Sequence, residues 1–502
     1  MPSCALGAVH NSLPFYKLYA GECTSIEAYA LATASVTEAI FAALPHLSSL
    51  LNVTHSSRHR PLSWHAGAAA TVAIQKLVKR GFAADTLLST LAAPFSLDDS
   101  LTARAAVSII NISEVDMVAA KELRIKAHSA LQTAIATMTA GVVTDKTPAW
   151  AILMSIEHER AAHETTLSLI RGLPCDALVM PKGWRIAPSR SENVNTVPLN
   201  NTLIQIVPLT PLLGLSRAMN ADIAAPNIIA DADLAERLAS RADALRACAH
   251  AGSTEDVTVS PFFVSQFKVS NREFLNFVEN NGYNDARWWK NDTNSSGSSS
   301  SSSSSYRMAP FFWVKKGEQW CLRMTWGEIN MPWDWPVEVT IEEVNAFLLW
   351  LSATSISTTE ISTTTVTHTF RLPSLAEHRT FWSLTDYDVS VPQTSPSLSG
   401  EPCDIPTPAA RWNVDFHWHS PCAVDAFKPS HVGVFDARGN VWEFVSDTSS
   451  RSDSTDIIAL TGGSWASNSD PATSTRYSAG KRAERGDACA AHTYASFRYV
   501  RE

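Results

Sequence analysis

The stretch from Trp150 to Pro174 constrains the fold most strongly, because it is suited to one long helix and to little else. It reads WAILMSIEHERAAHETTLSLIRGLP and contains neither glycine nor proline over 151–171. Its apolar residues recur at steps of three and four, which is the spacing of one helix face. Thr147 is a suitable N-terminal cap, and Gly172 is a typical end. We therefore predict a single helix over about 150–171.

This helix also carries the densest cluster of metal-capable side chains, namely His158, Glu159, His163 and Glu164. Two histidines on a helix can share a metal ion when they are three or four residues apart, because a helix turns by about 100° per residue. His158 and His163 are five apart, so their side chains point roughly 140° away from each other. The helix therefore offers one good metal ligand rather than two.

Composition limits the class of protein. The chain has 502 residues, of which 45% are hydrophobic and 18% charged, as in a globular protein of several domains. The net charge of −9 argues against a nucleic-acid partner, which requires a basic surface. The eight cysteines form no CxxC pair, which indicates a reducing compartment. No apolar run is long enough to span a bilayer, and no signal peptide is recognisable. We expect a cytoplasmic protein without a membrane partner, and a mitochondrial address stays open.

The first part of the chain, 1–175, reads as mostly helical. A four-helix bundle is the expected arrangement, because the segments are amphipathic and joined by longer connections. The stretch at 84–112 reads as irregular. The four predicted helices lie at 25–44, 62–82, 114–140 and 150–171.

Two further regions follow. Residues 176–256 read as a linker or insertion, with a segment from Leu203 that looks like short β or extended structure and a helix over 233–252. Residues 257–502 read as a mixed domain of short strands, aromatic residues and turns. Within it, the serine tract 291–305 is predicted to be a disordered loop, and 384–410 is a second variable stretch.

Six short sequence blocks of the last region, taken together and in order, are specific enough to indicate a family. They are VSNREF, PVEVTIEEVNAFLLWL, RLPSLAEHR, GNVWEF, GGSW and FRYV. In that order they resemble the formylglycine-generating-enzyme domain, also called sulfatase-modifying factor, whose fold is C-type-lectin-like. With a DinB-like helical bundle before it, the chain resembles the iron-dependent sulfoxide synthases of ergothioneine and ovothiol biosynthesis.

The closer resemblance is to the ovothiol branch, 5-histidylcysteine sulfoxide synthase. It rests on IEHER, ETTLSLIRGLP, FKVSNREFLNFVENNGY, FFWVKKG and EINMPWDWPVEV, and covers about 58–83, 148–174 and 262–500. The fold class that it implies is multidomain, α and α+β. A DinB-like four-helix bundle would precede a formylglycine-generating-enzyme domain, and the family's C-terminal methyltransferase is not expected here.

The resemblance also implies an iron centre. In the family, three histidines hold a non-haem Fe(II) that joins a cysteine thiolate, a histidine-type imidazole and O2, and imidazole ligands suit such iron. One histidine lies on the second bundle helix and two lie on the fourth, in an H-x3-H-x-E pattern. In this chain the matching positions are Ala68, His158 and Ala162. We therefore expect that the iron has been lost and that His158 is a remnant ligand.

Neighbouring histidines offer an alternative. His65 lies one turn before Ala68, and His163 follows Ala162. They would serve as iron ligands only if the ligand positions had shifted, which for His163 requires a local π-bulge. Otherwise both are expected to be ordinary, partly exposed histidines.

The loop between GNVWEF and GGSW departs from the family as well. The family places its catalytic tyrosine there, whereas residues 445–461 contain no tyrosine or other aromatic residue. Tyr477 is the nearest candidate for a catalytic role. With Arg476 and Arg482 it lies in a segment that resembles the family's substrate side, where basic groups could meet a carboxylate. The alternative is a solvated loop.

Two other activities can be compared. The copper-binding cysteine pair that formylglycine generation uses after GGSW is missing, so that activity is not supported. Asn440 and Glu443 resemble positions that hold a structural calcium ion in this fold, and oxygen ligands suit calcium. The alternative is that Asn440 holds a turn and Trp442 lies in the core. For Trp333 and Trp335 we expect packing roles.

These observations lead to a ranked set of functions. The first is a homologue of 5-histidylcysteine sulfoxide synthase that lacks the iron centre and acts as a non-catalytic binding or regulatory protein. Its partner would be a histidine- or thiol-type small molecule or another protein. The second is an active synthase that binds Fe(II) through His65, His158 and His163. The third, by analogy of fold alone, is a calcium-dependent module that binds glycans or proteins.

Overall fold

The structure is a computed structural model. It describes residues 21–44, 62–82, 117–139, 141, 143, 147–190, 199–207, 259–289, 308–358, 365–380, 412–430, 432–447, 457–467, 475–477 and 494–502. The segments at 84–112, 233–252, 291–305 and 384–410, for which the sequence makes predictions, lie outside these residues.

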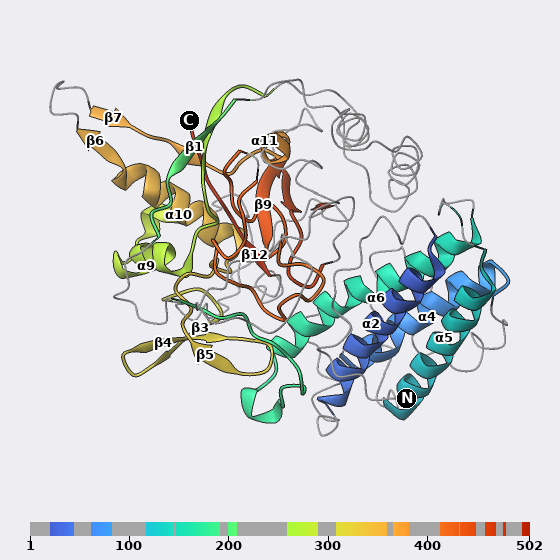
Figure 1. Cartoon of the computed structure of the whole chain (residues 1–502). Helices are drawn as coiled ribbons and strands as arrows, with labels where there is room; N and C mark the ends of the chain where they lie inside the picture. The colour runs from blue at the N-terminus through green and yellow to red at the C-terminus, as the bar shows by residue number, and fades with distance from the viewer. Residues whose placement is uncertain are drawn as a thin grey trace, which may run out of the picture.

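Four long helices pack together in the first part of the chain (Figure 1). They lie where the sequence predicts them, and the prediction of these helices is confirmed. Helix α4 packs against α5 and α6, and α2 packs against the same two helices, which makes a four-helix bundle. None of the helices that the structure describes has the length and apolar character that a bilayer crossing requires. The bounds are α2 (Cys23–Ala42), α4 (Leu62–Lys79), α5 (Met117–Thr137) and α6 (Pro148–Arg171).

The second part of the chain is built from small sheets, as the sequence predicts for short strands separated by turns. Two sheets have four strands, one in the order β1 (Leu203–Ile206), β2 (Phe262–Ser265), β13 (Val500–Arg501), β8 (Phe370–Arg371), the other β11 (Thr475–Tyr477), β10 (Ile457–Thr461), β9 (Trp442–Asp447), β12 (Ala495–Ser496). The remaining sheets are β3 (Trp313–Lys316), β4 (Gln319–Arg323), β5 (Glu328–Asn330) and the pair β6 (Ile356–Thr358), β7 (Thr365–Thr367). Among these named strands every neighbouring pair is antiparallel except β9 and β12.

Short helices connect these sheets, and local capping explains where they begin. Helix α10 starts at a capping box, in which Thr340 Oγ1 accepts from the Glu343 amide and Glu343 Oε2 accepts from the Thr340 amide. At the start of α9, Ser270 Oγ accepts a hydrogen bond from the Glu273 amide and so caps that helix. The helices and turns described here are η4 (Cys175–Ala177), α9 (Asn271–Glu279), η5 (Ala286–Trp288), α10 (Ile341–Thr354) and α11 (Leu375–Thr380).

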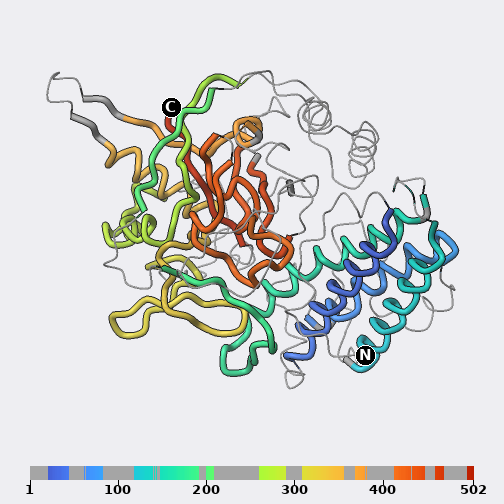
Figure 2. The backbone as a smooth tube through the Cα atoms, in the orientation of Figure 1, coloured from blue at the N-terminus to red at the C-terminus, as the bar shows by residue number. Residues whose placement is uncertain are grey.

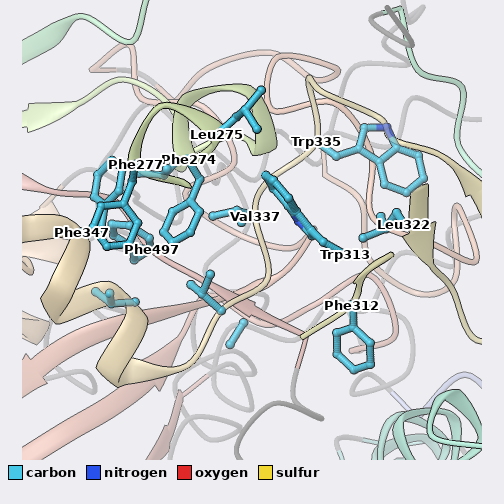
Figure 3. Packing of buried hydrophobic residues seen from close by; sticks show 14 of the residues in the cluster. Phe274, Leu275, Phe277, Phe312, Trp313, Leu322, Trp335, Val337, Phe347 and Phe497 are labelled. Carbon is cyan, nitrogen blue, oxygen red and sulfur yellow. The ribbon is translucent and has the colours of Figure 1, made fainter. Parts of the chain in front are cut away.

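An aromatic core fills the space between α9, α10 and the sheets (Figure 3). Phe274 and Phe347 stack with ring centroids 5.2 Å apart, and Phe497 packs edge-on against Phe347 at 5.4 Å. Trp333 and Trp335 are buried in this same cluster, which confirms the packing roles predicted for them. The segments that carry much of the family resemblance are thus parts of the core.

Part of the predicted linker belongs to the sheets. Strand β1 pairs with β2 in antiparallel register, with Leu203 opposite Ser265. Just before β1, the side-chain nitrogen Nδ2 of Asn201 donates to Glu273 Oε2 at 2.9 Å. The Tyr499 hydroxyl donates to Glu273 Oε1 at 3.0 Å. Burial raises the pKa of Glu273 to about 7. A half-buried carboxyl group on α9 therefore anchors this edge of the sheet.

Helix α6 extends from the bundle into the C-terminal half, and the chain continues from it along the β3–β5 sheet (Figure 2). At its end, Arg171 donates to both carboxylate oxygens of Glu338, at 2.5 and 3.1 Å, and to the Arg323 carbonyl at 2.8 Å. Arg323 donates in return to the carbonyls of Arg171 and Leu173, at 3.1 and 2.7 Å. These bonds satisfy carbonyls at the end of the helix and fix it to the sheet.

Replacing Glu338 by alanine should lower the free energy of unfolding by about 3–5 kcal/mol, because the Arg171 guanidinium would then be buried without its counter-ion. Urea denaturation followed by circular dichroism measures the change. The matched control is Glu122→Ala on α5, whose pair with Lys126 is solvent-exposed and should cost about 0.5 kcal/mol or less. Equal losses in the two variants would contradict this account of the interface.

The Glu273 carboxyl group should make stability depend on pH. Its pKa is raised from 4.5 to about 7 in the fold, so the folded protein keeps a proton that the unfolded chain releases. Stability should therefore fall as pH rises from about 4.5 to 7 and then level off, by on the order of 2–3 kcal/mol. The measurement is the difference between wild type and Glu273→Gln in urea unfolding across this range. A difference that does not change with pH would refute the prediction.

Candidate functional site

One stripe of polar side chains on α6 faces the C-terminal half of the chain. Arg160, Glu164 and Arg171 follow each other at steps of four and seven, which places them on one side of the helix. Glu164 is buried, and its Oε1 accepts a hydrogen bond from Ser464 Oγ at 2.9 Å and another from Trp442 Nε1. The bundle and the C-terminal domain are therefore joined through buried charged groups.

Arg160 makes the second of these junctions. Its Nη2 lies 2.6 Å from Asp415 Oδ1, and its Nη1 lies 3.3 Å from Thr33 Oγ1 on α2. The guanidinium also lies over the ring of Tyr29, 4.7 Å from its centroid. Arg160 therefore connects α2, α6 and the loop that carries Asp415.

His163 is buried beside this junction, with 3% of its surface exposed. Its Nε2 lies 2.6 Å from Thr37 Oγ1, which also donates to Glu159 Oε1 at 2.5 Å. The ring of Phe416 packs edge-on against the imidazole, with centroids 5.8 Å apart. The expectation of a partly exposed His163 is wrong, because the polar stripe turns this side of α6 toward α2 and the C-terminal domain.

The surroundings keep the His163 imidazole neutral. Burial lowers its pKa to about 3, and the positive charge of Arg160 acts in the same direction. Burial also raises the pKa of Glu159, against the opposing effect of the Thr37 hydrogen bond. The contact between Glu159, Thr37 and His163 is thus a hydrogen-bonded network inside the bundle.

His158 lies on a different side of α6 and is exposed to solvent. Its pKa is lowered because neighbouring chain partly desolvates the ring and because the Lys76 ammonium on α4 repels the imidazolium. Each histidine of α6 therefore has a positive side chain in its surroundings, Lys76 for His158 and Arg160 for His163. Such charges disfavour a divalent cation at either imidazole.

The other positions that the resemblance assigns to iron carry methyl groups. Ala68 is buried in an apolar cluster that also contains Leu167, Phe416 and Trp465, and Ala162 is half-buried. His65, one turn before Ala68, is half-buried and packs edge-on against Trp64 at 5.1 Å. Because Nε2 of His163 contacts Thr37 and His158 is the only histidine at one of the three ligand positions, the residues present do not fit a three-histidine iron centre.

Asn440 and Glu443 lie inside the C-terminal domain. Arg498 donates to both oxygens of the Glu443 carboxylate, at 2.5 and 2.9 Å, and the Lys268 ammonium lies 3.7 Å away. Burial alone would raise the pKa of Glu443, but these two cations hold it below its ordinary value.

The Asn440 side-chain oxygen accepts from the Cys422 amide at 2.9 Å, and the backbone of Asn440 is left-handed, with φ of +66°. The oxygens that calcium would need are thus bonded to protein donors. In this structure Asn440 stabilises a turn, Glu443 neutralises buried cations, and Trp442 is core.

The candidates near the family's substrate side are only partly described. The backbone of Arg476 and Tyr477 forms β11, where they lie opposite Leu460 and Ala459 of β10. Their side chains, and the whole of Arg482, lie outside the described residues, as does the connection 448–456 between β9 and β10. Their predicted roles stay predictions.

Four residues of the interface were not singled out from the sequence: Thr37, Arg160, Asp415 and Phe416. A signal for Arg160 was present, because Arg160, Glu164 and Arg171 share one helix face in a segment already known to be helical. No comparable signal marks Thr37 or Asp415, whose partners lie more than a hundred residues away along the chain.

Replacing Thr37 by valine should lower the free energy of unfolding by about 1–3 kcal/mol, because Glu159 and His163 would lose a buried hydrogen-bonding partner. Thermal or urea unfolding measures the loss. Thr133→Val on α5 is the matched control, since that hydroxyl is exposed and donates to the Ser129 carbonyl of its own helix. If both variants are equally stable, the network does not contribute as described.

Comparisons with known proteins agree with the C-terminal fold. No curated protein matches the chain. The crystal structure of CarF aligns with 61% of this chain and 99% of its own, at 14% identity and a TM-score of 0.29, a likeness too slight to support an argument. Residues 237–502, more than half of the chain, match the family of the sulfatase-modifying factor enzyme 1-like domain. The predicted resemblance of this region is thereby confirmed, and the chain belongs to the family of proteins that carry a sulfatase-modifying factor enzyme 1-like domain.

Proposed function

We propose that this protein is a non-catalytic relative of the 5-histidylcysteine sulfoxide synthases whose DinB-like bundle and C-terminal domain together form a binding or regulatory unit. The observation that carries the proposal is the state of His163. The only histidine beside the third ligand position has its Nε2 at 2.6 Å from Thr37 Oγ1, inside the bundle. It contributes to the packing of the two domains and is not presented for metal binding.

Three further observations support a loss of iron chemistry. Alanine occupies the two other ligand positions, and one of them, Ala68, is packed in an apolar cluster. Positive side chains lie near both histidines of α6. The short segment between GNVWEF and GGSW has no tyrosine, and its ends pair directly as β9 and β10.

The retained motifs are compatible with a non-catalytic role. Trp335 lies in the aromatic core, and Asp334 accepts hydrogen bonds from Ser189 Oγ and from the Arg190 amide, at 2.6 and 2.9 Å. The block EINMPWDWPVEV thus holds the segment after α6 against the C-terminal domain. Such residues are needed for the fold whether or not a reaction takes place. The bound partner would be a histidine- or thiol-type small molecule, or a protein.

The test is metal analysis after anaerobic loading with Fe(II) and desalting. Wild type should retain far less than one iron per chain. The double variant Ala68→His, Ala162→His should retain close to one, because it restores both missing imidazoles beside His158. The control is the same variant with His158→Ala, which should lose the iron again.

Two outcomes would contradict the proposal. Tight stoichiometric iron in wild type would favour an active synthase with shifted ligands. An active synthase would also consume O2 when histidine and cysteine are supplied, and the variant His158→Ala would no longer do so. Failure of a folded double variant to bind iron would show that these positions do not surround one site, and would remove the resemblance to the sulfoxide synthases on which the proposal rests. The match of residues 237–502 to the sulfatase-modifying factor enzyme 1-like domain would stand.

A further inference from the structure

A turn of unusual backbone carries the residue that pairs with Arg160. The His417 amide donates to the Val414 carbonyl at 2.9 Å, and the two residues between them, Asp415 and Phe416, have φ of +55° and +56°. Two positive φ values inside such a hydrogen bond are characteristic of a type I′ turn. Aspartate tolerates the first central position, but the second normally takes glycine. Phe416 therefore holds a strained conformation.

Contacts with α6 and with the C-terminal domain hold this turn in place. The Phe416 ring is fully buried and packs edge-on against His163 and against Trp465, at 5.8 and 5.4 Å. Asp415 adds its ion pair with Arg160. The turn thus stays closed because side chains outside it compensate for the strain.

In the ion pair between Arg160 and Asp415, the arginine is more deeply buried than the aspartate, and one N–H donor of the guanidinium is not used by any of the described residues. The Arg160 side chain is 3% exposed, whereas that of Asp415 is 22% exposed. Asp415 contacts Nη2 of Arg160, while the buried Nε of Arg160 has no hydrogen-bond partner within the part of the chain that the structure describes. A guanidinium can hold a carboxylate through two parallel N–H donors, and Asp415 uses only one donor here.

We propose that Asp415 is an internal substitute for the carboxylate of a ligand, and that Arg160 is the anchor of a carboxylate-binding subsite between α6 and residues 412–420. A small molecule with a carboxylate would approach from the exposed side of Asp415, displace it from Arg160 and pair with two donors. Release of the strained turn would favour this exchange, while the high effective concentration of the tethered Asp415 would oppose it. This inference rests on the binding role proposed above and names the chemical class that the interface would take.

The experiment compares wild type, Asp415→Asn and Asp285→Asn. Asp285 is the matched control, because its ion pair with Arg287 lies within an exposed surface turn. The probe is acetate, with acetamide as its neutral counterpart at the same ionic strength. Acetate binding is followed by NMR of its methyl group, and opening of the turn by hydrogen–deuterium exchange of residues 412–420. The amides of Asp415 and Phe416 report directly, since they donate to Ser467 and Trp465.

Acetate, and not acetamide, should speed exchange at 412–420 in wild type and in Asp285→Asn. In Asp415→Asn the segment should already exchange faster, and acetate should bind about tenfold more tightly, because the internal competitor has lost its charge. Adding Arg160→Lys, which keeps the charge but removes the two-pronged donor, should abolish that gain. Should Asp415→Asn fail to fold, Asp415→Glu keeps the charge, displaces the carboxylate by one methylene and should also bind acetate more tightly than wild type.

Equal acetate binding in Asp415→Asn and Asp285→Asn would overturn the subsite, as would equal effects of acetate and acetamide. An undiminished gain in the variant that also carries Arg160→Lys would show that Arg160 is not the anchor. These failures are distinct from failure of the proposed function, because iron retention by wild type would overturn the latter and leave the acetate measurements as they are.

Discussion

The buried polar stripe of α6 is the constraint on which the rest of the arrangement depends. Folding buries the charged side chains of Arg160, Glu164 and Arg171, and each of them binds a partner in the C-terminal half of the chain. A buried charge is tolerated only where its partners are in place, so these contacts must form together. The stripe therefore couples the folding of the bundle to that of the domain and fixes the rotation of α6 about its own axis.

The rotation of α6 about its axis determines the surroundings of His158 and His163. With the stripe facing the C-terminal domain, His163 enters the network of Thr37 and Glu159, and His158 remains exposed. A π-bulge that turned His163 toward the iron position would also displace Glu164, the next residue, from Ser464 and Trp442. A shift of ligands would thus require breaking the contacts that hold the two domains together.

The helices could be predicted from the sequence because the period of their apolar residues is local information, and α2, α4, α5 and α6 lie where that period places them. The core roles of Trp333 and Trp335 followed from their size and apolar surface in the same way. The burial of His163 could not be predicted, because α6 has polar residues on several sides. Which side is buried depends on the segments that pack against the helix, and these are distant in the sequence. The pairing of Asp415 with Arg160 could not be predicted either, because the two residues are 255 positions apart. Asp415 also lies in a turn whose central residues, Asp and Phe, give no sequence signal for a positive φ. Edge strand β1 was read as part of a linker, since four residues carry too little periodicity to assign a sheet partner.

Ligand number and surrounding charge do not weigh equally in the loss of a metal site. A complete set of ligands can contribute about 10 kcal/mol or more to the binding of a divalent ion. A positive side chain about 8 Å from that ion opposes it by only about 4 kcal/mol at an effective dielectric constant near 20. Lys76 and Arg160 can therefore weaken a metal site but not abolish one that has all its imidazoles, whereas Ala68 and Ala162 remove the larger contribution. Arg160 itself favours an anion at the interface with the C-terminal domain, and Asp415 satisfies that preference in the structure.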